Sequence, residues 1–246
     1  MKLPTLHGLI DRRILLNFTA DPADVARLVP APFRPKLYRG RAVVGICLIR
    51  LKHIKPKGWP DFLGIASENG AHRIAVEWDE DGQVQEGVYV PRRDTSLSLN
   101  ALVGGRLFSG KHFLAKFNVV EVNATYHVDF TSSDGTQVAI DAEETEVFAP
   151  DSLFETLEKV SDFLERGAVG YSPNGAAFDG LWLATYAWQV RPLAVRAIKS
   201  SFFEDETLFA KGSVKFDNAL LMTKIAHEWH TLPQKCRQLA GDEILG

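Results

Sequence analysis

Cysteine is scarce in this sequence: Cys47 and Cys236 are the only two among 246 residues. Two cysteines are too few to hold a fold of this size together with disulfides, so we expect reduced thiols and a cytoplasmic protein. There is no Cys-x-x-Cys pair and no paired Cys/His arrangement. The sequence therefore suggests no cysteine nucleophile, and simple burial is the ordinary role of such a residue.

Long apolar runs are also missing. No stretch approaches the roughly 20 residues that a membrane-spanning helix requires, and the opening MKLPTLHGLIDRR lacks the apolar core of a secretory signal. A net charge of -3 shows no basic excess of the kind that nucleic-acid or anionic-membrane binding usually needs. The sequence predicts neither partner, and it leaves a homo-oligomer open.

Several catalytic signatures are absent as well. The chain has no P-loop, no G-x-G-x-x-G and no G-x-S-x-G elbow. It has no internal repeat and no linker-like stretch, so we expect one domain over residues 1–246 with a polar tail from about residue 234. Hydrophobic residues make up 46% of the chain, which is enough for a substantial core.

What the sequence does contain is many apolar runs of strand length joined by short turns. These predict an α+β fold built on a mainly antiparallel sheet, because no βαβ alternation occurs. We expect a turn at Glu68-Asn69-Gly70, a hairpin turn ending at Asp81-Gly82, and a loop over 167–180. Residues from 214 onward are ambiguous between a strand and a helix capped by Asp217. The expected strands are 9–19, 42–53, 72–78, 84–90, 111–122, 123–130, 136–148 and 181–200, and the expected helices follow Asp21 and cover 96–103 and 152–165.

The densest positive charge lies between residues 92 and 116. This stretch contains one carboxylate, Asp94, and five cations, which gives a local excess of four positive charges. The cations are Arg92, Arg93, Arg106, Lys111 and Lys116. Arginine binds carboxylates and phosphates through its planar fork, so this stretch predicts one wall of a pocket for a small anion. Arg92 and Arg93 would point to opposite faces of a strand, so at most one enters the pocket. The alternative is structural, with these arginines paired to nearby carboxylates.

Two further groups are candidates for chemistry. Glu68, with His72 and Arg73 nearby, could act as a general base if burial raises its pKa; the alternative is an exposed or ion-paired glutamate. The segment HEWH at 227–230 could bind a metal through His227 and His230 if it were helical. If it is extended, Glu228 and His230 share a face instead, and a third metal ligand would have to come from His112 or His127.

Several segments resemble the acetoacetate decarboxylase-like superfamily. They are RILLN at 13–17 running on to DP at 21–22, VPAP at 29–32, SENG at 67–70 and GR at 105–106. The strongest resemblance is to its uncharacterised YqjF-like branch (domain of unknown function 2071), through PRRDT at 91–95, GGRLF at 104–108 and HEWH at 227–230. It covers roughly residues 9–233. It implies a closed antiparallel barrel or cone with helices outside and a ligand cavity within.

The resemblance also implies a lysine that forms a Schiff base, but the sequence departs from that pattern. Phe113 and Leu114 stand where the paired lysines would be, and in a strand Lys116 would share a face with Leu114 and His112. We therefore expect a protein that binds a keto acid or related carboxylate without that lysine pair. The alternatives are a lyase or hydrolase using Glu68 and Arg106, and a metal-binding protein. The predicted site comprises Glu68, Lys111 and Lys116 as catalytic groups and Arg92, Arg93, Arg106 and His112 as ligand-binding groups, with no cofactor and no metal.

Overall fold

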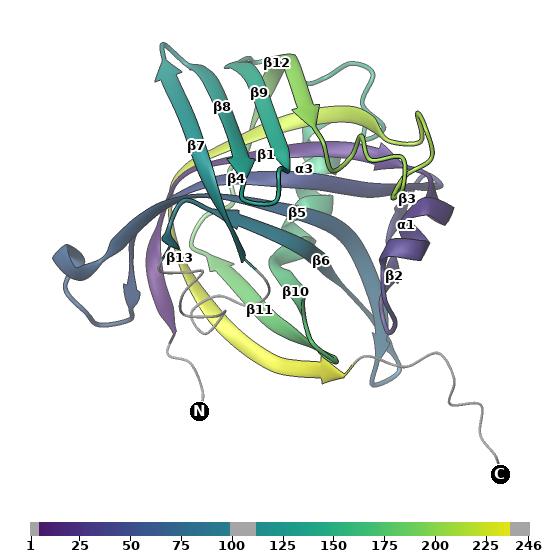
Figure 1. Ribbon diagram of the computed structural model, residues 1–246, viewed down its shortest axis with the longest axis horizontal. Coiled ribbons are helices and arrows are strands. Elements are labelled where there is room, and N and C mark those ends of the chain that lie inside the picture. Colours follow the sequence, from purple (N-terminus) through teal and green to yellow (C-terminus); the bar gives the residue numbers. More distant parts are fainter. Residues whose placement is uncertain (1–4, 99–111, 237–246) are drawn as a thin grey trace.

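A computed structural model describes residues 5–98 and 112–236 of the chain, and the architecture is mainly β (Figure 1). The long strands are β1 (Leu6–Ala20), β4 (Arg41–Pro56), β5 (Ile65–Glu80), β6 (Gln83–Thr95), β7 (His112–Val122) and β13 (Lys215–Cys236). The shorter strands are β2 (Arg34–Pro35), β3 (Leu37–Tyr38), β8 (Thr125–Ser132), β9 (Gln137–Glu144), β10 (Val169–Asn174), β11 (Ala177–Thr185) and β12 (Arg191–Ser200). The helices are α1 (Pro22–Leu28), α3 (Leu157–Glu165) and the 3-10 turns η1 (Asp61–Leu63) and η2 (Arg166–Ala168).

The strands form one sheet that closes on itself twice. The larger ring runs through β6, β7, β8, β9, β12, β13, β1, β4 and β5. The smaller ring runs through β6, β10, β11, β13, β1, β4 and β5. The two rings therefore share β13, β1, β4, β5 and β6. In Figure 1, β1, β4, β5 and β6 cross the middle between β7–β9 above and β10–β11 below, and the yellow β13 curves from the upper part down to the bottom of the view.

The sheet divides at two strands whose partner changes along their length. β13 pairs through Ala219–Leu221 with β12 and through His227–Cys236 with β11. β6 pairs through Val88 and Tyr89 with β10 and, further along, through residues 93–95 with β7. These two divisions open the space for two separate interiors.

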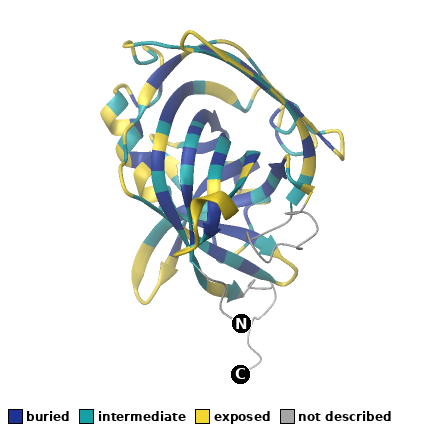
Figure 2. Ribbon diagram, turned by 90° about the vertical axis from the view of Figure 1, so that its left-hand side faces the viewer, coloured by how far each residue is buried: buried dark blue, intermediate teal, exposed yellow. Residues whose placement is uncertain are grey.

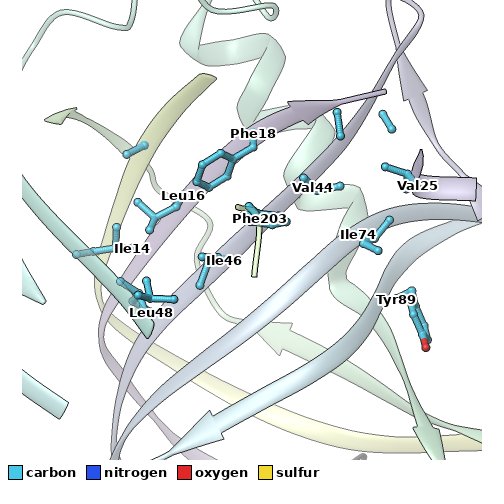
Figure 3. Packing of buried hydrophobic residues seen from close by; sticks show 14 of the residues in the cluster. Ile14, Leu16, Phe18, Val25, Val44, Ile46, Leu48, Ile74, Tyr89 and Phe203 are labelled. Carbon is cyan, nitrogen blue, oxygen red and sulfur yellow. The ribbon is translucent and has the colours of Figure 1, made fainter. Parts of the chain in front are cut away.

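The shared strands accordingly bury both faces. On β4, Val44, Ile46 and Leu48 pack with Ile14 and Leu16 in one core, shown in Figure 3. The alternate residues Val43, Cys47 and Leu51 join a second core with α3. The near-continuous apolar run over residues 42–53 predicts a strand buried on both faces, and the structure confirms this. Figure 2 shows the same pattern as buried strand centres and exposed connections.

The helix cap predicted at Asp21 is confirmed, whereas the cap expected at Asp151 for the helix over 152–165 is wrong. Asp21 accepts a hydrogen bond from the amide of Ala23 at 2.9 Å, and Pro22 is the first helical residue of α1. The helix expected from residue 152 begins only at Leu157, because Thr156 caps it through the amide of Lys159 at 3.3 Å. α3 buries Val160, Phe163 and Leu164 against the second core.

Three of the predicted elements are wrong. The turn expected at Glu68-Asn69-Gly70 is continuous strand in β5. Gly70 allows close packing there, since a Cβ on it would lie 2.8 Å from the ring of Phe130. The loop expected over 167–180 contains η2, β10 and the start of β11, and the single strand expected over 181–200 is divided into β11 and β12.

β13 resolves the ambiguity of the C-terminal region in favour of a strand. Leu221, Ile225 and Trp229 have helical spacing, but Lys224 has a positive φ of 57° that shifts the alternation by one residue. Leu221 therefore faces the first core, whereas Ile225 and Trp229 face the second. Residues 234–236, expected in a polar tail, complete this strand.

Candidate functional site

A cavity of about 130 Å³ lies inside the smaller ring. All seven strands of that ring contribute side chains or backbone to it, and α3 and η2 close one side. Its apolar lining includes Ile10, Leu15, Ile49, Leu51, Val88, Val90, Phe163, Leu164, Leu181, Leu183, Trp188 and Trp229. Its polar lining consists of Arg13, Lys36, Cys47, Asn69, Arg73, Arg93, Asp94 and His112. An apolar enclosure with a few polar groups is the usual form of a small-molecule site.

Three of the polar residues are the cavity arginines Arg13, Arg73 and Arg93, which project from β1, β5 and β6. None of them forms an ion pair with a carboxylate among the residues that the structure describes. Guanidinium groups that are removed from water are costly unless a negative charge or hydrogen bonds compensate them. The cavity therefore has an excess of positive charge that suits an anion.

Arg93 has a neutral partner. Its Nε and Nη2 both donate to the hydroxyl of Ser172 on β10, each at 3.3 Å. Burial lowers the pKa of Arg93 to about 10, because the charged form loses its hydration. The side chain thus keeps most of its hydrogen-bonding capacity for a ligand.

Arg73 is 5% exposed and lies over the backbone of the neighbouring strand. Its cross-strand partner is Gly45, where a Cβ would lie 3.1 Å from Nη2 of Arg73. The guanidinium reaches across this glycine and donates to Oδ1 of Asn17 on β1. Its Nε is buried without a hydrogen-bond partner in the described parts of the chain. Burial also lowers the pKa of Arg73.

Arg13 contacts sulfur and an aromatic ring. Its Nη2 donates to Sγ of Cys47 at 3.8 Å, and its Nη1 lies 4.0 Å from Sδ of Met222. The guanidinium carbon is 5.9 Å from the ring centre of Trp188, within the range of a cation–π contact. These soft contacts hold Arg13 in place without neutralising its charge.

The other charged lining residues are already paired. Nζ of Lys36 lies 2.5 Å from a carboxylate oxygen of Glu86 and 4.2 Å from the ring centre of Phe163. Asp94, with 0% exposure, is bound by Arg92 and by the hydroxyl of Ser132. The excess charge of the cavity therefore comes from the three cavity arginines.

Adjacent Arg92 and Arg93 do point to opposite faces of β6, as the alternation predicts. Arg92 contacts Asp94 at 2.7 Å and Asp134 at 2.5 Å, and its guanidinium lies 4.1 Å from the ring centre of Phe113. Arg92 lowers the pKa of Asp134, while burial raises that of Asp94. The structural alternative considered for these arginines thus describes Arg92, whereas Arg93 lines the cavity.

Glu68 lies away from the cavity. Its carboxylate binds Arg12 at 2.6 Å and Arg50 at 2.5 Å, and Arg12 also binds Glu121 at 2.5 Å. The cavity is lined instead by the next residue of β5, Asn69. The structure therefore places Glu68 in a salt-bridge network, because β-strand alternation turns it to the opposite face.

The remaining predicted site residues divide into three groups. His112, at the start of β7, lines the cavity. Lys116 and Leu114 are exposed, whereas the intervening Ala115 is buried, so Lys116 lies on the outer face of the larger ring. Arg106 and Lys111, with most of the helix expected over 96–103, lie outside the described residues.

The HEWH segment is extended, which excludes the helical arrangement that would bring its two histidines together. Glu228 and His230 share the outer face, 3.3 Å apart, whereas His227 is turned inward with 0% exposure. Glu228 also binds Lys57 at 2.8 Å and Tyr186 at 2.6 Å, and these hydrogen bonds lower its pKa to about 2. Within residues 5–98 and 112–236 no group of three potential metal ligands was found.

Sequence reasoning did not place the polar lining residues Arg13, Lys36, Cys47 and Asn69 in the site, and it considered Arg73 only as a neighbour of Glu68. The signal that could have found two of the arginines is their position: Arg13 and Arg73 directly precede the apolar strand residues 14–16 and 74–76. Charged residues next to such runs are seldom fully buried unless they are paired. No comparable signal marks Cys47, because a buried cysteine is ordinary.

With this geometry in hand, the chain can be compared with known proteins. The model of the DUF2071 family, described as an uncharacterized conserved protein, matches residues 10–224. The chain belongs to the DUF2071 family. No curated protein sequence matches it. The match begins within β1 and ends in the middle of β13, and it includes every other strand of both rings.

Solved structures show that this DUF2071 protein has the acetoacetate decarboxylase-like fold. Acetoacetate decarboxylase from Legionella pneumophila is 13% identical at a TM-score of 0.60, covering 96% of this chain and 88% of that one. An acetoacetate decarboxylase-like enzyme from Sphingomonas wittichii is 10% identical at 0.57, covering 95% and 92%. The enduracididine biosynthesis enzyme MppR, solved in complex with pyruvate, is 9% identical at 0.57, covering 96% and 91%. The expected fold, a closed β structure, is thus confirmed. In addition, no described helix has the length and apolar character needed to cross a membrane.

Proposed function

We propose that this DUF2071 protein binds a small organic anion, a keto acid or related carboxylate, in the cavity of its smaller ring. The observation that carries the proposal is the set of three cavity arginines without a carboxylate partner among the described residues. Segment 99–111 cannot supply the missing negative charge through a side chain, since its sequence contains no aspartate or glutamate. A ligand carboxylate would compensate these cations through charge-assisted hydrogen bonds.

The size of the cavity restricts the ligand. A cavity near 150 Å³ holds a molecule of benzene size, and the volume here is about 130 Å³. Such a space suits a compound of roughly six to eight non-hydrogen atoms rather than a nucleotide or a sugar phosphate. Pyruvate, the ligand in one MppR complex, falls in this range.

The arrangement of lysines supports binding rather than Schiff-base chemistry of the family type. Lys36 is the one lysine in the described lining of the cavity, and it is occupied by Glu86. Lys116 is on the outer face of the larger ring. Catalysis by Glu68 would require a carboxylate that is free of Arg12 and Arg50, and it is not.

Thermal stabilisation by ligands tests the proposal. A ligand that binds only the native protein stabilises it by RT ln(1 + [L]/Kd), about 2.7 kcal/mol at 100 times Kd. Pyruvate, acetoacetate and other carboxylates of this size should raise Tm, whereas the neutral amide of the same acid should not. Arg93→Met should remove the shift, because it deletes a cavity cation without adding a polar group.

Arg196→Met is the matched control. Arg196 is 62% exposed and pairs with Glu143 far from the cavity lining, so its replacement should leave the ligand-induced shift intact. The absence of a shift with every carboxylate, or an equal shift with their neutral amides, would contradict the proposal.

A further inference from the structure

We propose that Cys47, in the lining of this cavity, is a nucleophile whose sulfur attacks an electrophilic carbon of the bound anion. This inference rests on the proposed function for the identity of its ligand. It differs from the expectation from the sequence, where no Cys-x-x-Cys pair and no Cys/His arrangement suggested a cysteine nucleophile. The partners are brought to Cys47 by the sheet.

Strand register places Cys47 among the cavity arginines. Cys47 lies opposite Leu15 on β1 and Ala71 on β5, and Ala71 lies opposite Arg93 on β6. Arg13 is two residues before Leu15, and Arg73 is two residues after Ala71, so both point to the same face as Cys47. Arg93 lies in the same row two strands away, a backbone distance of about 10 Å.

The side chains on this face leave room around the sulfur. Ala71, between Cys47 and Arg93, is small, and the space over Gly45, two residues before Cys47, holds the guanidinium of Arg73. Nη2 of Arg13 donates to Sγ of Cys47 at 3.8 Å. A ligand carboxylate held by the arginines would therefore lie beside the sulfur.

A second observation at the same place points independently to a ligand. Arg73 is 95% buried, lines the cavity, and has a buried Nε without a hydrogen-bond partner in the described chain. A buried donor of this kind is costly unless something binds it. Cys47 itself is 4% exposed and also lines the cavity.

The electrostatics agree with the geometry. Burial by itself would raise the pKa of Cys47, but the charges of Arg13 and Arg73 and their hydrogen bonds to sulfur outweigh it, so the pKa is lowered. The thiolate is the reactive form of cysteine. Arg73 and Arg93 in turn are the cations that would hold the carboxylate.

The reaction with a keto acid balances without a cofactor. The thiolate donates an electron pair to the carbonyl carbon, a C–S bond forms, and the π pair of the C=O bond moves to oxygen. The proton released when the thiol ionised returns to that oxygen. The product is a hemithioketal, the sum of thiol and ketone, and nothing is oxidised or reduced.

Alkylation kinetics test this proposal with two probes that differ in charge. Cys236→Ser leaves Cys47 as the single thiol of the chain. Iodoacetate carboxymethylates the sulfur and iodoacetamide carbamidomethylates it, in both cases with loss of iodide. Mass spectrometry measures the rate of each reaction. A cavity lined by one sign of charge raises encounter rates with ions of the opposite sign by about 10–10³-fold. The ratio of the iodoacetate rate to the iodoacetamide rate should therefore be at least about tenfold higher in the native protein than in the urea-unfolded chain.

Two further measurements connect the preference to the arginines. Arg13→Met should abolish it, and Arg196→Met should not. Raising the ionic strength should slow iodoacetate but not iodoacetamide, a result that needs no variant. Pyruvate should slow both reagents if it occupies the same cavity.

The outcomes separate this inference from the proposed function. A native preference no greater than that of the unfolded chain, or a Cys47 that neither reagent modifies, would overturn the inference. Cys47→Ser should still be stabilised by carboxylates, and that result together with an unreactive Cys47 would leave the binding function standing. A reactive, anion-selective Cys47 without any carboxylate-induced Tm shift would instead overturn keto-acid binding and keep the nucleophile.

Discussion

Gly45 and Arg73 are cross-strand partners, and the guanidinium of Arg73 lies in the space that a side chain at position 45 would fill. Gly45→Ala should therefore displace Arg73 and clash with the carbonyl oxygen of Leu16. Overpacking of this kind costs about 1–3 kcal/mol. Urea unfolding should show that loss, together with weaker stabilisation by pyruvate. Gly170→Ala is the control for the urea unfolding measurement alone, because its Cβ would meet Val88 at an ordinary 3.4 Å but Gly170 itself lines the cavity. Equal stability of both variants would contradict the account.

Neighbouring Arg92 and Arg93 should respond oppositely to the same substitution. Arg92→Met would leave the fully buried Asp94 without its guanidinium, which costs about 3–5 kcal/mol when a buried pair is broken. Arg93→Met removes a half-buried cation whose one hydrogen-bond partner in the described part of the chain is Ser172, so the unliganded protein should be as stable or more stable. Chemical denaturation without ligand measures both. A large loss of stability in Arg93→Met would show that its charge is compensated within the protein.

Two buried histidines should make stability depend on pH. Burial lowers the pKa of His72 to about 3 and that of His227 to about 4, from 6.5. Between pH 6.5 and 4 the unfolded chain binds protons at these positions and the native protein does not, so the free energy of unfolding falls as pH falls. The slope reaches about 1.4 kcal/mol per pH unit for each histidine. His227→Leu should reduce the slope in this range.

His127 is the control with the opposite sign. Hydrogen bonds to Asp141 and Asp129 raise its pKa, so its contribution is present below pH 6.5 and is lost as pH rises through the raised value. His127→Leu should therefore not flatten the slope between pH 6.5 and 4. An unchanged slope in His227→Leu would contradict the assignment.

Gly70 and Phe130 should be energetically coupled across the larger ring. A Cβ at position 70 would lie 2.8 Å from the Phe130 ring, which is 1% exposed and cannot move freely. Gly70→Ala should cost about 1–3 kcal/mol. Because Phe130→Leu removes the obstructing atoms, the double variant should lose less than the sum of the two single losses. Additive losses in urea unfolding would argue against this contact.

Lys116 should not form a Schiff base with a keto acid. It is exposed on the outer face of the larger ring and does not line the cavity of the smaller ring. Borohydride reduction in the presence of pyruvate, followed by peptide mass spectrometry, should leave Lys116 unmodified. The same treatment without pyruvate is the control. An adduct on Lys116 above that background would contradict its placement outside the site.

Much of the fold could be predicted from short segments. Residues 42–51 predict a strand buried on both faces, and the structure confirms this because two cores meet at β4. Asp81 and Gly82 predict a hairpin turn, and both have positive φ, 51° and 74°. Asp21-Pro22 predicts the start of α1. These features depend on neighbouring residues, so local chemistry is sufficient to predict them.

The candidate site was predicted less well, and β-strand alternation is the reason. A shift of one residue separates Glu68, held by Arg12 and Arg50, from Asn69, which lines the cavity. Because the sequence predicted a turn at residues 68–70, the alternation of side chains along this part of β5 was not considered. Arg92 and Arg93 were separated correctly, but which of them faces a cavity depends on strands that come later in the chain.

The sequence by itself determined the strand periods, the caps and the alternation of Arg92 and Arg93, because these follow from backbone geometry over a few residues. Only the tertiary structure decided that Arg13, Cys47, Arg73 and Arg93 share one cavity. These four residues come from β1, β4, β5 and β6, and their proximity follows from which strands pair and in which register. Which distant strands pair is decided by the joint burial of apolar side chains in both cores. The sequence of one strand alone does not specify its partner or its register.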